Sequence, residues 1–154
     1  MSTDDAKSSY RRGVVQGATP VRLVILLYEQ LAEDLRRATA ALEQGATEAR
    51  THHLGHAHEV LGLLQGCLNM NAGQEVAHNL GRFYSALREN LLRVQFHPDR
   101  RVLEKHLAQL LSLREAWIEV ERRNTAESKV ASDPVAQASP NASDNQTSQA
   151  DWRA

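Results

Sequence analysis

The residues best suited to chemistry are four histidines within one short stretch of the chain, namely His52, His53, His56 and His58. His52 and His56 are four residues apart, so on a helix their imidazoles share one face and could reach the same metal ion. Only Glu59 stands at a matching offset and no cysteine lies nearby, so the ligand set is incomplete. We interpret the cluster as a solvated group or the rim of a groove, where histidine titration near neutral pH would make binding pH-dependent. A His-rich metal-binding bundle stays an alternative.

Two further patterns match catalytic sites only in part. Glu75 and His78 have the Glu-x-x-His spacing of di-iron bundles, but such sites need a second copy of the motif and two more inward glutamates. Cys67 is the only cysteine and has no evident base beside it, so it is expected to be a small residue of the core or of a groove. No glycine-rich phosphate loop or Ser-His-Asp arrangement is present. We predict that the protein is not an enzyme and holds no metal or cofactor.

Charge and hydropathy exclude several partner classes. The formal net charge is -1 and the pI is about 6.7, so no bulk positive field attracts nucleic acid or an anionic membrane. The longest apolar run, residues 23–28, is far shorter than the roughly 20 residues of a membrane span. Residues 1–7 are polar and carry no apolar signal-peptide core. We expect a soluble, cytoplasmic protein with no nucleic acid partner and no membrane insertion.

Four segments of the chain have helical periodicity, and none alternates like a strand. Thr19 and Pro20 open the first as an N-cap and a first-turn proline, and Gly45 ends it. Asp99 can cap the last. The expected helices cover about residues 19–43, 47–69, 74–96 and 99–123. The third carries one apolar seam, which consists of Val76, Leu80, Phe83, Leu87, Asn90 and Val94.

These elements predict an all-α fold. Short connections between helices of similar length favour an antiparallel up-down-up-down four-helix bundle. We assign residues 1–18 to a mobile N-terminal arm and residues 19–123 to the bundle. Residues 124–154 are rich in Ser, Ala, Asn, Asp and Gln, cannot bury enough apolar surface to offset their ordering entropy, and are expected to form a disordered tail.

Three helices are more apolar than a bundle core requires, since core packing needs one stripe about 100° wide. The first helix is apolar almost all round at its start, where Leu23, Ile25 and Leu26 are expected to form a surface on which the preceding arm docks. The second and fourth helices carry spare apolar positions, which are Val60, Leu63 and Cys67 on the second and Val102, Leu111, Leu113, Ile118 and Val120 on the fourth. From the pattern alone, a partner groove and a helix wedged among three neighbours explain this surplus equally well.

A third face of the second helix carries Gly55, Gly62 and Gly66. Each glycine costs about 1 kcal/mol relative to alanine in a helix interior. Either another backbone approaches this face closely or the helix is soft, and the sequence leaves both open.

Several short motifs follow one another in order between Tyr10 and Val120. They are Tyr10 itself, residues 18–20 (Ala-Thr-Pro), residues 23–28 (Leu-Val-Ile-Leu-Leu-Tyr), residues 72–80 with Asn69 before them, Phe83-Tyr84, Leu87-Arg88, Leu91 and residues 113–117 (Leu-Arg-Glu-Ala-Trp). Together they resemble the flagellin export chaperones of the FliS family, which have a tyrosine-bearing arm, a Leu-Tyr run, a Gly-Gly-Glu-Ile-Ala-x-Asn-Leu signature and a Leu-Arg-Asp/Glu-x-Trp motif. Ala72 replaces a glycine, Gln30-Leu31 replaces smaller residues, and the tail is long, which leaves the partner preference open.

The resemblance implies a non-enzymatic chaperone of the flagellar type III secretion system. Such a protein binds the C-terminal helical segment of flagellin by coupled folding and binding, prevents premature polymerisation and supports export. It favours the groove interpretation, with Tyr10, Val60, Leu63, Cys67, Leu111 and Ile118 as the expected flagellin-binding residues. The flagellar export gate or other flagellar regulators are expected as further partners. The alternative is a regulatory adaptor that binds another flagellar or transcriptional factor through the same groove.

Overall fold

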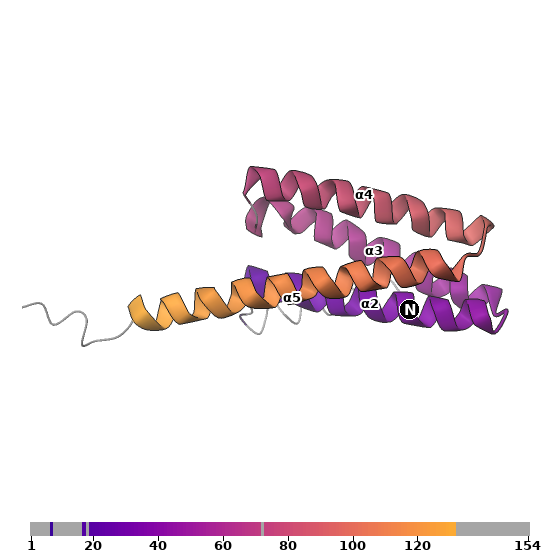
Figure 1. The fold of residues 1–154 in the computed structure, drawn as a ribbon, viewed down its shortest axis with the longest axis horizontal. Helices are drawn as coiled ribbons and strands as arrows, with labels where there is room; N and C mark the ends of the chain where they lie inside the picture. Colours follow the sequence, from indigo (N-terminus) through magenta and orange to yellow (C-terminus); the bar gives the residue numbers. More distant parts are fainter. Residues whose placement is uncertain (1–6, 8–16, 18, 72, 132–154) are drawn as a thin grey trace, which may run out of the picture. The chain divides into compact units, whose positions relative to one another are not determined.

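The computed structural model describes Lys7, Gly17 and residues 19–71 and 73–131, which contain four long helices and no strand (Figure 1). The helices are α2 (Pro20–Glu43), α3 (Thr47–Asn71), α4 (Gln74–Phe96) and α5 (Arg100–Ala131). The predicted all-α fold is confirmed. None of the described helices is long and apolar enough to span a bilayer.

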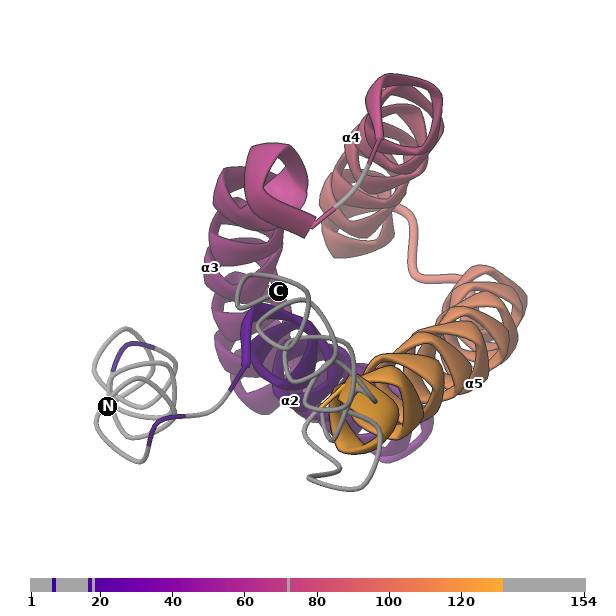
Figure 2. The ribbon, with the colours of Figure 1, turned by 90° about the vertical axis from the view of Figure 1, so that its left-hand side faces the viewer.

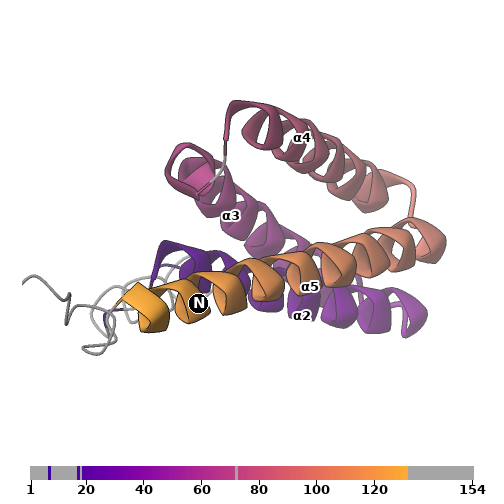
Figure 3. The ribbon, with the colours of Figure 1, turned by 60° about the vertical axis from the view of Figure 1, so that its left-hand side comes forward.

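The chain divides into two compact units, Met1–Glu121 and Arg122–Ala154. In the first unit, consecutive helices run in opposite directions (Figure 1). Figure 2 looks along the helices and shows α3 next to α2, and α4 next to α3. The part of α5 that belongs to this unit crosses α2 (Figure 3), and side-chain ion pairs join the two helices.

The helices begin where the sequence places capping residues. The Thr19 hydroxyl accepts a hydrogen bond from the Arg22 backbone N–H at 3.1 Å, and Pro20 takes the first helical position. The Asp99 carboxylate accepts one from the Arg101 backbone N–H at 2.9 Å. Each side chain satisfies a backbone donor that has no partner inside the helix. Both predicted caps are confirmed.

Gly45 ends α2 through a hydrogen-bonding pattern that needs a left-handed residue. Its φ is +68°, a conformation that side chains other than glycine rarely adopt. The Ala46 N–H donates to the Ala41 carbonyl at 2.8 Å, and the Gly45 N–H donates to the Leu42 carbonyl at 3.2 Å. These two bonds form a Schellman motif, which reverses the chain so that α3 returns along α2.

In the core, α3 packs against α2 on one side and against α4 on the other. Val60 is 0 % exposed and Cys67 is 7 % exposed, and both belong to the hydrophobic core. Leu63 is partly buried against the same core. The sequence predicts that this stripe of α3 is not covered by the bundle. This prediction is wrong for Val60 and Cys67, because the two neighbouring helices cover both flanks of α3.

The glycine face of α3 has no close backbone neighbour within the described chain. A Cβ at Gly55 or Gly66 would meet nothing within 4 Å, and one at Gly62 would meet the Arg88 guanidinium at 3.7 Å. Close backbone approach by a neighbouring helix of this chain therefore does not explain these glycines.

The last helix is longer than expected. α5 continues to Ala131, so its predicted end near Arg123 is wrong and the first residues of the predicted tail are helical. Residues 125–131 (Thr-Ala-Glu-Ser-Lys-Val-Ala) contain neither Gly nor Pro, and Pro134 is the first helix breaker. The arm with Tyr10 and the tail from residue 132 onward lie outside the described residues.

Candidate functional site

An open pocket of about 450 Å³ lies between α4 and α5 and is the candidate partner site. The two helices diverge from the loop that joins them in Figure 3. We call this pocket the α4–α5 groove. Its lining residues are Val76, Asn79, Leu80 and Phe83 from α4 and Gln109, Ser112 and Leu113 from α5.

The apolar floor of the groove continues the core seam of α4. Leu80 is buried and Phe83 packs against the core, but Val76, one helical turn before Leu80, is 51 % exposed. The sequence placed Val76 in the core seam, so the structure corrects this position. The N-terminal end of α4 carries more apolar surface than the described part of the chain covers.

The groove is also uncharged. Asn79, Gln109 and Ser112 are its polar residues, and no Asp, Glu, Lys or Arg among the described residues lines it, although 24 % of the chain is charged. A charged group of a partner that is buried in this groove would lose its hydration without gaining a counter-ion, which costs free energy. The chemistry of the lining therefore favours a partner with an apolar, uncharged contact face.

His106, which is 6 % exposed, contacts two residues of the groove lining, Gln109 and Phe83. Its Nδ1 lies 3.0 Å from the Gln109 Oε1, and its Nε2 lies 2.9 Å from the Asn90 Nδ2. A neutral ring with the proton on Nδ1 satisfies both contacts, donating to Gln109 and accepting from Asn90. Burial lowers the pKa of His106, which keeps the ring neutral at ordinary pH. The ring centroid is 6.4 Å from that of Phe83.

A buried network of aromatic side chains supports the floor of the groove. The hydroxyls of Tyr28 and Tyr84 are 2.6 Å apart, and Trp117 also hydrogen bonds Tyr28. The rings of Phe83 and Tyr84 are 6.0 Å apart. Burial raises the pKa of both tyrosines, so both stay protonated. The network joins α2, α4 and α5 through three residues of the sequence motifs.

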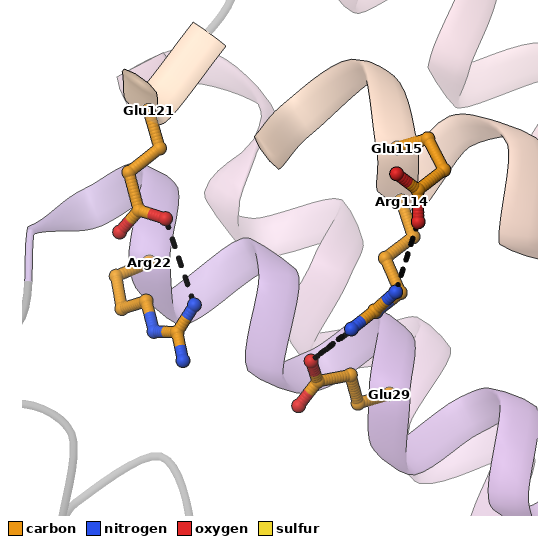
Figure 4. Close-up of polar contacts among 5 residues, drawn as sticks. All are labelled: Arg22, Glu29, Arg114, Glu115 and Glu121. Atoms are coloured by element: carbon orange, nitrogen blue, oxygen red, sulfur yellow. Dashed lines mark hydrogen bonds and ion pairs between the residues drawn. The ribbon is translucent and has the colours of Figure 1, made fainter. Parts of the chain in front are cut away.

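Ion pairs attach the other edge of α5 to α2 (Figure 4). Arg114 Nη2 lies 2.8 Å from the Glu29 Oε1, and Arg22 Nη1 lies 3.5 Å from the Glu121 Oε2. Arg114 also contacts Glu115 at 3.1 Å. Partly exposed pairs of this kind contribute little to stability, but they fix which edge of α5 faces α2.

The predicted binding residues of α5 lie on that α2-facing edge. Leu111 and Ile118 flank Arg114 at helical spacing and are both half-buried. Neither of them lines the α4–α5 groove. Of the spare apolar residues predicted on this helix, Leu113 is the one that lines it. Leu111 and Ile118 therefore stay predicted contacts, on a surface separate from the groove.

The predicted arm-docking surface of α2 is mostly covered. Leu23 is 9 % exposed and Ile25 is 0 % exposed, while Leu26 is half-buried. Tyr10, the predicted contact of the arm, lies outside the described residues. Docking of the arm stays a prediction.

The histidine cluster is divided between the core and the surface. His56 is 5 % exposed, and its Nδ1 lies 2.6 Å from the Asp34 Oδ2 of α2. The interpretation as one solvated or groove-rim group is therefore wrong for His56. His52 is exposed and His53 is half-buried, with ring centroids 5.2 Å apart. Among the described residues, no group of three or more His, Cys, Asp or Glu is placed to hold a metal ion.

The pair of Asp34 and His56 could have been found from the sequence. Both stand eleven residues from Gly45, one on each side, so a helical hairpin that turns at Gly45 brings them face to face. Burial raises the pKa of the Asp34 carboxyl, and the His56 hydrogen bond opposes this shift.

The comparison with known proteins agrees with this architecture. The family described as "Flagellar protein FliS" matches residues 2–124. The flagellar secretion chaperone FliS of Salmonella typhimurium is 31 % identical over 108 residues, which cover 69 % of this chain and 79 % of that protein. FliSB of Pseudomonas aeruginosa, also a flagellar secretion chaperone, is 30 % identical over 103 residues, covering 67 % and 82 %. FliS of Bacillus subtilis is 25 % identical over 127 residues, covering 80 % and 94 %.

Proposed function

Since this chain belongs to the FliS family of flagellar secretion chaperones, we propose that its export substrate is flagellin. In this proposal the protein acts in the cytoplasm and binds the C-terminal helical segment of flagellin. It prevents premature polymerisation and supports delivery of the substrate to the flagellar secretion apparatus. It has no enzymatic activity.

One structural observation supports this proposal most directly, namely the uncovered apolar surface of the α4–α5 groove. Val76 is 51 % exposed beside the buried Leu80, and Leu113 forms the opposite wall. Amphipathic helices bind proteins by laying an apolar face into such a channel. A helical export substrate would cover Val76 and Leu113 together.

Binding would be coupled to folding of the substrate. A disordered segment that folds on a surface loses conformational entropy at that moment, so it needs many apolar contacts along an extended path. We propose that Leu63, Leu111 and Ile118, all half-buried, extend the contact beyond the groove. Val60 and Cys67 would take part only if α3 shifts, because both are buried in the core.

We further propose that the N-terminal arm competes with the substrate. Tyr10 would contact the apolar surface of α2 at the predicted docking positions, of which Leu26 is half-buried and Leu23 and Ile25 are buried. Its release would expose area to flagellin.

Two substitutions on α4 form a matched test. Val76 and Leu92 are both apolar and both 51 % exposed, but only Val76 lines the groove. We expect Val76→Asp to weaken binding of a flagellin C-terminal peptide at least about tenfold, because a charge would enter an uncharged contact. Leu92→Asp should bind like the wild type. Isothermal titration measures the affinities, and circular dichroism verifies that both variants fold.

The two possible failures have different meanings. If the wild-type chain does not bind the flagellin segment, the proposed function is wrong. If it binds and Val76→Asp binds equally well, flagellin binds elsewhere and the groove has no part in it.

A further inference from the structure

We propose that Gln109 determines the specificity of the α4–α5 groove by donating a hydrogen bond to an uncharged acceptor on the contact face of a helical partner. This inference rests on the proposed function, since it describes the substrate chemistry of the same groove. It adds the requirement that the partner carry a hydrogen-bond acceptor, which apolar contacts alone do not impose.

The side chain of Gln109 is held by a neighbour on its own helix. His106 Nδ1 lies 3.0 Å from the Gln109 Oε1, so the carbonyl end of the amide is engaged and the NH2 end remains for an incoming group. The ring is held in turn by Asn90 of α4, at 2.9 Å from its Nε2. Because His106 is 6 % exposed, packing restricts its rotation. Gln109 itself is exposed, and its hydrogen bond with His106 is what orients its donor on the wall of the groove.

The rest of the lining restricts which acceptor suits this donor. Leu80, Phe83 and Leu113 require apolar side chains from the partner. A partner lysine could not accept the hydrogen bond that the Gln109 NH2 group donates, and it would find no carboxylate among the residues that line the groove. A partner glutamate could accept a hydrogen bond, but the groove offers it no cation. An amide or hydroxyl side chain meets both requirements.

The partner is therefore an amphipathic helix whose apolar stripe is flanked by Gln, Asn, Ser or Thr. Asn79 and Ser112, the other polar lining residues, can hydrogen bond with the same kind of side chain. A partner helix with a charged flank is the competing possibility, and the following measurement separates the two.

Three synthetic helical peptides test the inference. They share one apolar stripe and differ at a single flanking position, which is Gln, Glu or Lys. For the wild-type chain we expect the Gln peptide to bind most tightly and the Lys peptide at least about tenfold more weakly. Methyl NMR shifts of Val76, Leu80 and Leu113 report whether each peptide occupies the groove.

The variant Gln109→Glu should reverse this order, because a carboxylate on the groove wall would attract the Lys peptide and repel the Glu peptide. Ala108→Glu is the matched control. It places the same charge on the neighbouring exposed residue, which does not line the groove, and should keep the wild-type order.

Equal binding of the three peptides, or no shift at the groove methyls with any of them, would overturn the inference. Failure of Gln109→Glu to reverse the order would also overturn it. Such results leave the proposed function intact if the flagellin segment still binds the wild-type chain. Conversely, if the chain prefers the Gln peptide but does not bind the flagellin segment, the inferred role of Gln109 is supported and flagellin is not the substrate.

Discussion

Two helices of the same unit, α2 and the part of α5 up to Glu121, are attached in different ways. α2 buries twelve of its 24 residues, whereas the whole of α5 buries four of its 32, namely Leu103, His106, Leu110 and Trp117. α2 is packed on several sides, while α5 contacts the core along one narrow seam. This difference teaches where a partner can bind. A narrowly attached helix leaves an edge free, and the α4–α5 groove lies along that edge.

The largest effect should come from a cavity in the densely packed region. Leu35 of α2 is 0 % exposed, so Leu35→Ala should destabilise the fold by about 2–5 kcal/mol. Leu113→Ala, on the groove edge of α5, should cost less than about 1 kcal/mol because its site is open to solvent. Urea unfolding followed by circular dichroism measures both. Equal losses would mean that α5 is packed as firmly as α2.

A smaller effect should come from the link between the two regions. Tyr28→Phe removes the hydroxyl that joins Tyr84 and Trp117, and leaves the buried Tyr84 hydroxyl without this partner. We expect a loss of about 1–3 kcal/mol, the usual cost of a buried polar group that loses its hydrogen bond. The control is Tyr10→Phe in the arm. A Tyr28→Phe protein as stable as the wild type would show that packing alone joins the helices.

The smallest effect concerns the pH dependence that His106 gives to α5. Because burial lowers the pKa of His106 below its usual 6.5, the unfolded chain binds a proton more readily than the folded chain. The stability from neutral His106 is therefore complete above pH 6.5 and is lost as the pH falls toward the lower folded-state pKa. His106→Gln keeps a polar side chain beside Asn90 but does not titrate.

The measurement is the unfolding free energy of both proteins at several pH values between 7.5 and 5.5. The wild type should lose more stability on acidification than His106→Gln. Parallel curves would contradict the assignment of this dependence to His106. Lys105 is charged at every pH in this range, so its repulsion of a protonated ring adds to the same trend.

Much of the fold could be predicted because its boundaries depend on local chemistry. Thr19, Gly45 and Asp99 act through hydrogen bonds within a few residues, so their types and positions identify the ends of helices. The end of α5 was missed for the opposite reason. A polar composition indicated disorder, but Ala, Glu and Lys are also good helix formers, and the helix continues until breakers approach.

The candidate site was harder to predict, because exposure depends on which helices are neighbours. The same periodicity placed Val60 among the surplus positions and Val76 in the core seam. In the structure Val60 is buried and Val76 is exposed. Helical spacing identifies faces but not what covers them. The role of Gln109 was also missed, since its orientation depends on a hydrogen bond from His106 that composition does not reveal.

The Schellman turn at Gly45 also has a consequence for the order of folding. Asp34 and His56, which face each other across that turn, are 22 residues apart in the chain, whereas Tyr28 and Tyr84 are 56 residues apart. Closing the shorter loop costs less entropy, so the α2–α3 hairpin is expected to form first during synthesis. The last helix must then dock on a hairpin that already exists. On this account, newly made chains pass through a stage in which the surface later covered by α5 is still open.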